Sequence, residues 1–191
     1  SRYLNQALQR TAQVQNLGQA REMEILLEYY RLAIRALAKS APGEQQLREA
    51  MALWEVQHPG VAVEISLIGI NTSETRILVR TPMGLTEVRQ DQYGFVKGSP
   101  ATQALKQRDL KAGSVELSKL TDVLYPPSAF PMQMGPQSFV LYRLITPVHD
   151  AQGALRGYLV VGVDAAALRN ILSLYNSAKS PLYAFARTSE T

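Results

Sequence analysis

Six side chains between residues 93 and 164 have the chemistry needed to hold a small molecule. Tyrosine places a hydroxyl at the tip of an apolar ring, arginine donates paired hydrogen bonds to a carboxylate, and aspartate accepts hydrogen bonds or pairs with a cation. Taken singly, each tyrosine is more often a core aromatic residue. The candidate ligand-binding residues are Tyr93, Tyr125, Tyr142, Arg143, Tyr158 and Asp164.

Arg143 stands among aliphatic residues and needs an anionic partner if it is buried, because an unpaired charge is costly to remove from water. The sequence offers Asp164, Glu64 or a ligand carboxylate for that role. An exposed position on an edge strand, or a salt bridge within the protein, explains the same residue without a ligand. Because side chains alternate along a strand, Tyr142 and Arg143 cannot both face a pocket, and the sequence leaves open which one does.

The strand predicted at residues 155–163 has two different faces. Alternation places Tyr158, Gly162 and Asp164 on one face, and the aliphatic residues Leu159 and Val161 on the other. We expect the aliphatic face to meet helices and the mixed face to meet a ligand. Asp164 also stands where it would cap a following helix, which explains it without a ligand.

The composition argues against most catalytic classes. There is no cysteine, and the two histidines, His58 and His149, both fall in predicted turns, so neither a thiolate site nor a zinc site is expected. The nucleophile elbow, the P-loop and the dinucleotide-binding glycines are all absent from the sequence. The 20 basic and 16 acidic residues are spread along the chain, which does not favour a nucleic-acid partner. We therefore expect a domain without catalytic residues, metal or cofactor.

Two helices are predicted to open the chain. Residues 2–40 hold no proline and only one glycine, Gly18, and their apolar residues recur with helical spacing. A helix of that length would extend about 60 Å at its usual rise, so its first half should project beyond a core or pair with another copy. A break at residues 40–43 separates it from a second predicted helix at residues 43–58.

The rest of the chain changes to strand-like alternation. Glycine and proline punctuate the pattern, and an irregular insert at residues 84–119, with a short helix near residues 101–108, precedes a loop rich in proline and methionine at residues 125–136. Strands grouped between helices indicate an α+β fold with an antiparallel sheet. The predicted strands cover residues 61–70, 76–80, 138–147 and 155–163, and a helix follows from Asp164 to about Asn176.

Residues 142–164, YRLITPVHDAQGALRGYLVVGVD, resemble the closing hairpin of Cache domains, which are PAS-like sensor modules. In that family a strand ending in Pro-Val leads through an Asp-x-x-Gly turn into a strand of the form Gly-x-x-x-x-Gly-x-Asp. Here Pro147 ends the first strand, Asp150 and Gly153 form the turn, and Gly157 and Gly162 are expected to permit close backbone approach.

The resemblance implies a PAS-like antiparallel sheet of about five strands, with a ligand pocket between one sheet face and the insert at residues 93–125 that covers it. It further implies a place between two membrane segments of a bacterial histidine kinase, chemoreceptor or diguanylate cyclase. No complete amino-acid-binding signature is present, which leaves the ligand class open. The chain also continues past the exit helix instead of leading straight to a membrane segment, which allows for a further domain behind it.

The sequence therefore predicts an extracytoplasmic, periplasmic sensor domain that binds a small-molecule ligand and signals through its N-terminal helix. We expect a signalling and dimerisation helix at residues 1–40, a sensor domain at 41–176 and a tail or linker at 177–191. Flanking membrane segments would anchor the full-length protein in the inner membrane. We also expect a homodimer through the N-terminal helix. The alternative is a PAS-like interaction or dimerisation module with no small-molecule ligand.

Overall fold

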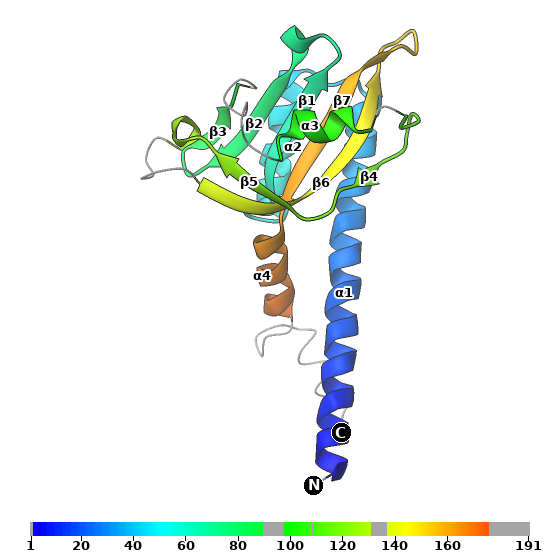
Figure 1. The fold of residues 1–191 in the computed structure, drawn as a ribbon, viewed down its shortest axis with the longest axis vertical. Coiled ribbons are helices and arrows are strands. Elements are labelled where there is room, and N and C mark those ends of the chain that lie inside the picture. The colour runs from blue at the N-terminus through cyan, green and yellow to red at the C-terminus, as the bar shows by residue number, and fades with distance from the viewer. Residues whose placement is uncertain (1, 90–97, 108, 131–136, 176–191) are drawn as a thin grey trace. The chain divides into compact units, whose positions relative to one another are not determined.

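The computed structural model describes residues 2–89, 98–107, 109–130 and 137–175 (Figure 1). The chain divides into two compact units. Residues 31–167 form one, which we call the sheet unit, and the residues up to Tyr30 together with those from Leu168 onward form the other. The sheet and the buried polar residues described below belong to the sheet unit, whereas Tyr93 lies outside the described residues.

The helices begin and end close to where the sequence places them. The long first helix is α1 (Arg2–Lys39) and the second is α2 (Glu44–Gln57), which buries Leu47, Met51 and Trp54. The short helix of the insert is α3 (Pro100–Leu105), where the Ser99 hydroxyl accepts a hydrogen bond from the Thr102 amide. The last is α4 (Ala165–Tyr175), which the Asp164 carboxylate caps by accepting from the Ala166 amide at 2.9 Å.

The sheet is antiparallel, as the sequence predicts, and the α+β class is confirmed. In the described residues it has seven strands, in the order β3-β2-β1-β7-β6-β4, with β5 also paired to β6. The four predicted strands are all present, and their bounds are extended or shifted by a few residues. The strands are β1 (Ala62–Gly69), β2 (Arg76–Thr81), β3 (Gly84–Glu87), β4 (Glu116–Leu117), β5 (Thr121–Tyr125), β6 (Gln137–His149) and β7 (Leu155–Asp164).

Both faces of the central strands are buried, which explains why β1 and β7 are apolar almost throughout. In Figure 1, α3 lies in front of β1 and β7 and α2 lies behind the sheet. Tyr158 and Val160 belong to the core in front of the sheet, together with Ala101 and Ala104 of α3. We call this the α3 face. Leu159 and its alternate neighbours face the α2 side, as predicted.

The two glycines of β7 have different roles. A Cβ on Gly157 would clash with the carbonyl oxygen of Ile68 on β1, so this glycine permits close backbone approach, as expected. A Cβ on Gly162 would instead meet side-chain atoms, lying 2.9 Å from Leu141 Cδ1 and 3.2 Å from Glu64 Cβ. The expectation of a close backbone approach was therefore wrong for Gly162, where the missing side chain leaves room for other side chains.

Candidate functional site

A fully buried ion pair lies on the α3 face of the sheet. Arg143 of β6 and Glu64 of β1 both have no exposed side-chain surface. Arg143 Nε donates to Glu64 Oε1 and Nη2 donates to Oε2, each at 3.0 Å, so the two groups meet in the paired geometry that suits a guanidinium and a carboxylate. Of the anionic partners that the sequence offers Arg143, the structure selects Glu64.

The absence of a side chain at Gly162 makes this ion pair possible. Glu64 of β1 and Arg143 of β6 are both register partners of Gly162 on the strand between them. Neighbouring strands lie about 4.8 Å apart, so a side chain on β7 would stand between the two charged groups. Because residue 162 is glycine, the side chains of Glu64 and Arg143 can meet above it.

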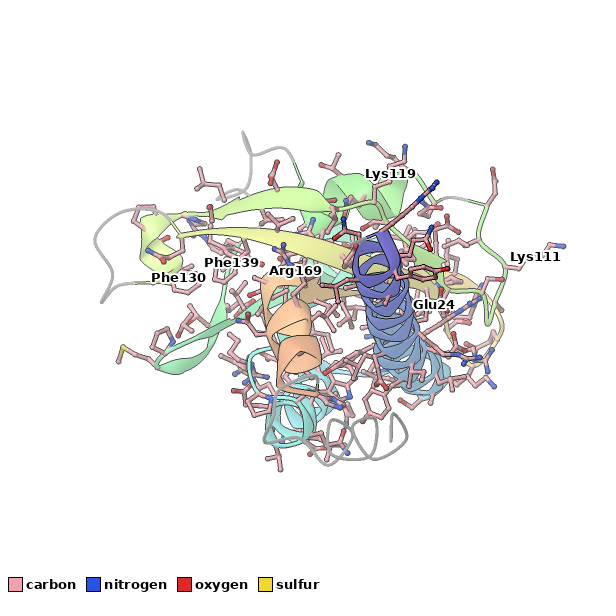
Figure 2. The ribbon with its side chains drawn as sticks, turned by 90° about the horizontal axis from the view of Figure 1, so that it is seen from below. Glu24, Lys111, Lys119, Phe130, Phe139 and Arg169 are labelled. Carbon is pink, nitrogen blue, oxygen red and sulfur yellow. The ribbon has the colours of Figure 1, made fainter. Side chains whose placement is uncertain are left out.

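Tyr125 completes the carboxylate's hydrogen bonding from another strand. Its hydroxyl, at the end of β5, donates to Glu64 Oε2 at 2.7 Å, and the whole residue is buried. The ring packs against Phe139 and Phe130, with centroids 5.6 Å and 5.8 Å away. Figure 2 shows these two phenylalanines beside one another. The aromatic contacts hold the Tyr125 hydroxyl in place against the carboxylate.

Arg143 also connects the sheet to the segment that covers it. Its Nη1 donates to the carbonyl oxygen of Gly98 and, at 3.1 Å, to Oε1 of Gln103 in α3. Gln103 in turn donates from Nε2 to the Thr121 hydroxyl at 2.8 Å. A single buried guanidinium therefore links β6, β1 and the α3 segment, which we call the α3 cover. A change in its hydrogen bonds would affect the α3 cover as well as the sheet.

Ser66 is the one polar residue of this region whose hydroxyl lacks a partner within the described part of the chain. It is fully buried, and its Oγ makes no hydrogen bond there. Ser66 lies two residues after Glu64 on the same side of β1, between its register partners Ile77 of β2 and Val160 of β7. A buried hydroxyl without a partner costs free energy, so Ser66 marks a place where an added polar group would be stabilised.

The structure brings together some of the predicted residues and separates others. Arg143 and Tyr125 meet at Glu64, and Tyr158 packs in the same core. Tyr142 is half-buried and alternates with Arg143, so it lies on the opposite face, which answers the question of which of the two faces α3. Asp164 caps α4.

Sequence reasoning did not identify the other members of the buried group. Gly98 and Gln103 fall in the irregular insert, and Ser66 lies inside an apolar run without any distinctive spacing. Glu64 was considered only as one possible partner of Arg143. The one available signal is a charged residue, Glu64, in a strand that holds no other charge.

The described residues contain no cluster of three or more histidine, aspartate or glutamate side chains that could hold a metal ion. None of their helices is both long enough and apolar enough to cross a membrane. Burial lowers the pKa of His58, the residue that follows the last turn of α2, below its usual value.

No protein family model matches this sequence, and no curated protein matches it either. Solved structures do match. A domain of a sensory box/GGDEF family protein from Vibrio parahaemolyticus superposes with a TM-score of 0.56 at 14% identity, covering 85% of this chain and 62% of that one. The sensory domain of the Campylobacter jejuni chemoreceptor Tlp3, with isoleucine bound, superposes with a TM-score of 0.50 at 14% identity, covering 93% and 65%.

These similarities concern the fold. The chain has the α+β fold of those sensory domains, in agreement with the Cache-like architecture that the closing hairpin implies. It spans less than two thirds of the length of either one.

Proposed function

We propose that this chain is an extracytoplasmic sensor domain of a bacterial transmembrane receptor and binds a small molecule on the α3 face of its sheet. The observation that carries the proposal is the buried, unpartnered hydroxyl of Ser66 beside the Glu64 and Arg143 pair. The fold shared with sensory domains, one of which has isoleucine bound, supports a sensing role. The domain has no catalytic role in this proposal, and the output belongs to the rest of the receptor.

The site's chemistry favours a ligand without net charge. Glu64 and Arg143 neutralise one another, and the surrounding core is apolar, so an added net charge would be desolvated without compensation. A small molecule with an apolar body and a polar group directed at Ser66 fits these constraints. A zwitterion also fits, because its two charges can pair with the two buried groups.

Binding would act on the α3 cover. Ser66 has no exposed surface, so a ligand reaches it only when the cover moves. Arg143 holds that cover through Gly98 and Gln103, so a ligand that changes the bonding of Arg143 shifts the balance between two positions of α3. The signal would pass through α1, whose last residues, 31–39, belong to the sheet unit. We propose residues 1–40 as the signalling helix, 41–176 as the sensor domain and 177–191 as a tail.

The test is a thermal-shift screen of the chain against amino acids, small carboxylates, amines, nucleobases and sugars. A ligand at about 100 times its Kd stabilises by about 2.7 kcal/mol, which raises the Tm by roughly 5 to 10 °C in a chain of this size. Replacing Ser66 by alanine should raise the stability of the free protein by roughly 1 kcal/mol, because a buried unsatisfied hydroxyl is removed. The same change should weaken ligand binding by about tenfold.

Ser138→Ala is the matched control, because Ser138 is exposed on β6 and makes no hydrogen bond through its hydroxyl in the described residues. It should change neither stability nor binding. A flat screen, together with native mass spectrometry showing no copurified molecule, would contradict the sensor proposal. That result would favour an interaction module. The internal pairing of Glu64, Arg143 and Tyr125 is what a core filled by its own side chains would show.

A further inference from the structure

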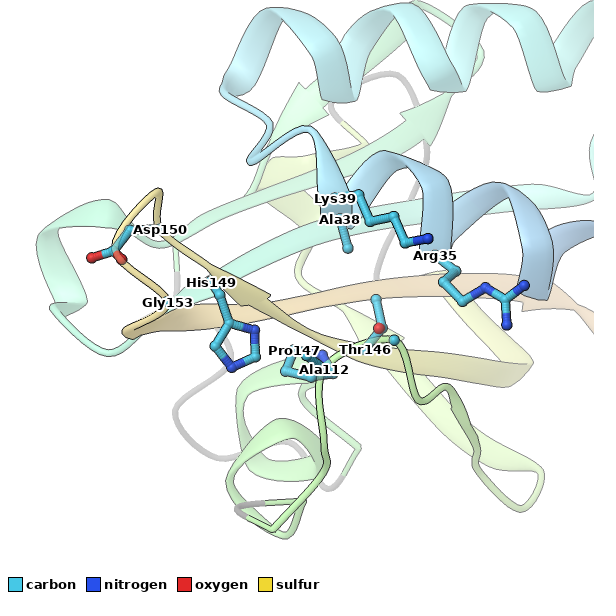
Figure 3. Close-up of a pocket in the computed structure, with 10 residues that line it drawn as sticks. Arg35, Ala38, Lys39, Ala112, Thr146, Pro147, His149, Asp150 and Gly153 are labelled. Carbon is cyan, nitrogen blue, oxygen red and sulfur yellow. The ribbon is translucent and has the colours of Figure 1, made fainter.

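A pocket lies within the sheet unit, at the junction of α1 with the β6–β7 hairpin. It has a volume of about 360 Å³, close to the lower end of the range for small-molecule sites. Figure 3 shows its walls, with the end of α1 on one side and the hairpin and Ala112 on the other. Gly113 also lines the pocket. Ser66 is not among the residues that line this pocket.

The floor of this pocket is formed by buried residues, one of which is hydrogen-bonded to the adjoining turn. Ala38, Thr146 and Pro147 are buried, and the Thr146 hydroxyl donates to the carbonyl oxygen of Ser114 at 2.9 Å. That bond fixes the adjoining turn, in which Gly113 adopts a positive φ of 81°. A preformed floor lowers the ordering cost of binding, which distinguishes this pocket from a crevice between mobile side chains.

The walls are cationic. Arg35 and Lys39 both line the pocket, and no carboxylate of the described residues pairs with either of them. They stand four residues apart on one face of α1, which separates them by about 6 Å along the helix axis. His149 adds a third nitrogen-bearing side chain.

The one acidic residue in the lining is engaged elsewhere. Asp150 Oδ1 accepts hydrogen bonds from the amides of Gln152 and Ala154, each at 2.9 Å, and so forms part of the hairpin turn. In Figure 3 its carboxylate points away from Arg35 and Lys39. The positive charges of the α1 wall therefore have no internal counter-ion in the pocket.

We infer that this pocket binds a small organic dianion, in particular a short dicarboxylate, and constitutes a site distinct from the one proposed on the α3 face. Two acidic groups joined by a short carbon chain match two cations one helical turn apart, and Arg35 can bind a carboxylate through paired hydrogen bonds. The ligand would connect the last turns of α1 to the hairpin. This inference goes beyond the proposed function and does not depend on it.

The test is an NMR titration of the whole chain with succinate at low ionic strength, with acetate and inorganic phosphate as comparison ligands. Succinate should shift the amide signals of Arg35, Lys39, Gly113 and His149. Arg35→Gln should weaken succinate binding by about tenfold or more, the loss expected for a charge-assisted hydrogen bond. Acetate and phosphate should bind much more weakly, because neither can reach both cations.

Two control variants keep the test specific. Arg31→Gln removes the same charge from α1 one turn earlier, outside the pocket lining, and should leave succinate binding nearly unchanged. Ser66→Ala should leave it unchanged as well. Equal losses in Arg31→Gln and Arg35→Gln would show general charge attraction and overturn the proposal. So would binding of phosphate as tight as that of succinate, a loss in Ser66→Ala, or no shift of the pocket signals at millimolar succinate.

Discussion

At the scale of single residues, the pair Glu64 and Arg143 dominates the interior of the sheet unit. Both side chains are removed from water completely, so each depends on the other for compensation of its charge. Tyr125 adds a hydroxyl to the carboxylate, and Gly98 and Gln103 occupy Nη1 of the guanidinium. Residues with this many mutual hydrogen bonds stabilise the fold only when all of them are present, because removing one leaves the others without a partner.

Replacing either member alone should therefore be far more damaging than replacing both. We expect Arg143→Met to lower the free energy of unfolding by about 3–5 kcal/mol, since it leaves the Glu64 carboxylate buried without a cation. Glu64→Leu should cost a similar amount. The double variant should be markedly more stable than the sum of the two losses predicts. Urea denaturation followed by circular dichroism measures all three.

The exposed pair between Arg48 and Glu44, 3.1 Å apart on α2, provides the control for this cycle. Arg48→Gln should change stability by only about 0.5 kcal/mol or less, because water screens an exposed pair. If the effects of Arg143→Met and Glu64→Leu simply added, the two residues would not depend on one another as the structure indicates.

The sequence could single out Arg143 because a charged residue is unusual among aliphatic strand residues, and it offered Tyr125 only as one of several tyrosines. It could not identify their common partner. Glu64 and Arg143 are 79 positions apart, and they meet only because β7 lies between β1 and β6. Sheet order is a long-range property that local alternation does not determine. Ser66 could not be predicted for a different reason. The sequence does not show whether the hydroxyl of a single strand serine has a hydrogen-bond partner, because that depends on the surrounding packing.

At the scale of the elements, periodicity predicted the long helices and strands and missed the short ones. The helical pattern of residues 2–40 and the alternation in β6 and β7 each extend over enough residues to be read without a structure. The strands β4 and β5 have two and five residues, and β4 lies inside the irregular insert while β5 begins just after it. Their pairing with β6 gives them their conformation, so their own sequence is a weak guide to it.

The middle strand β7 is the element on which the ion pair depends. We expect Gly162→Val to destabilise the protein by several kcal/mol, because the new side chain would occupy the space between Glu64 and Arg143. Gly162→Ala should have a smaller effect, since Leu141 and Glu64 can shift their side chains by a fraction of an ångström. The free energy of unfolding measures the series.

Gly18→Ala is the control for the Gly162 series, because a new side chain at this position meets no neighbouring atoms. No atom lies within 4 Å of a Cβ at this exposed position in α1, and alanine should stabilise the helix by about 0.5–1 kcal/mol. If Gly162→Val in the Arg143→Met background cost as much as in the wild type, the glycine would be required for packing alone and not for the ion pair.

At the scale of the whole molecule, α1 is the element that both compact units share. Among the described residues, its side chains include exposed apolar residues. Ile25 is 58% exposed and Leu32 is 47% exposed, and their spacing of seven positions places both on one face of the helix. Exposed apolar residues in such a repeat favour contact with a second amphipathic helix, which supports the proposed dimer.

We therefore expect the chain to self-associate through α1. Sedimentation equilibrium across a range of concentrations should show a reversible dimer, and the double variant Ile25→Glu with Leu32→Glu should abolish it, because four like charges would face one another across the interface. Val56→Glu is the matched control, since Val56 is 81% exposed near the end of α2, and it should leave the dimer intact. A monomer at every concentration, or a dimer lost equally in the control, would remove α1 as the dimer contact. Either result would also count against signalling by a movement of α1 relative to the α1 of a second copy.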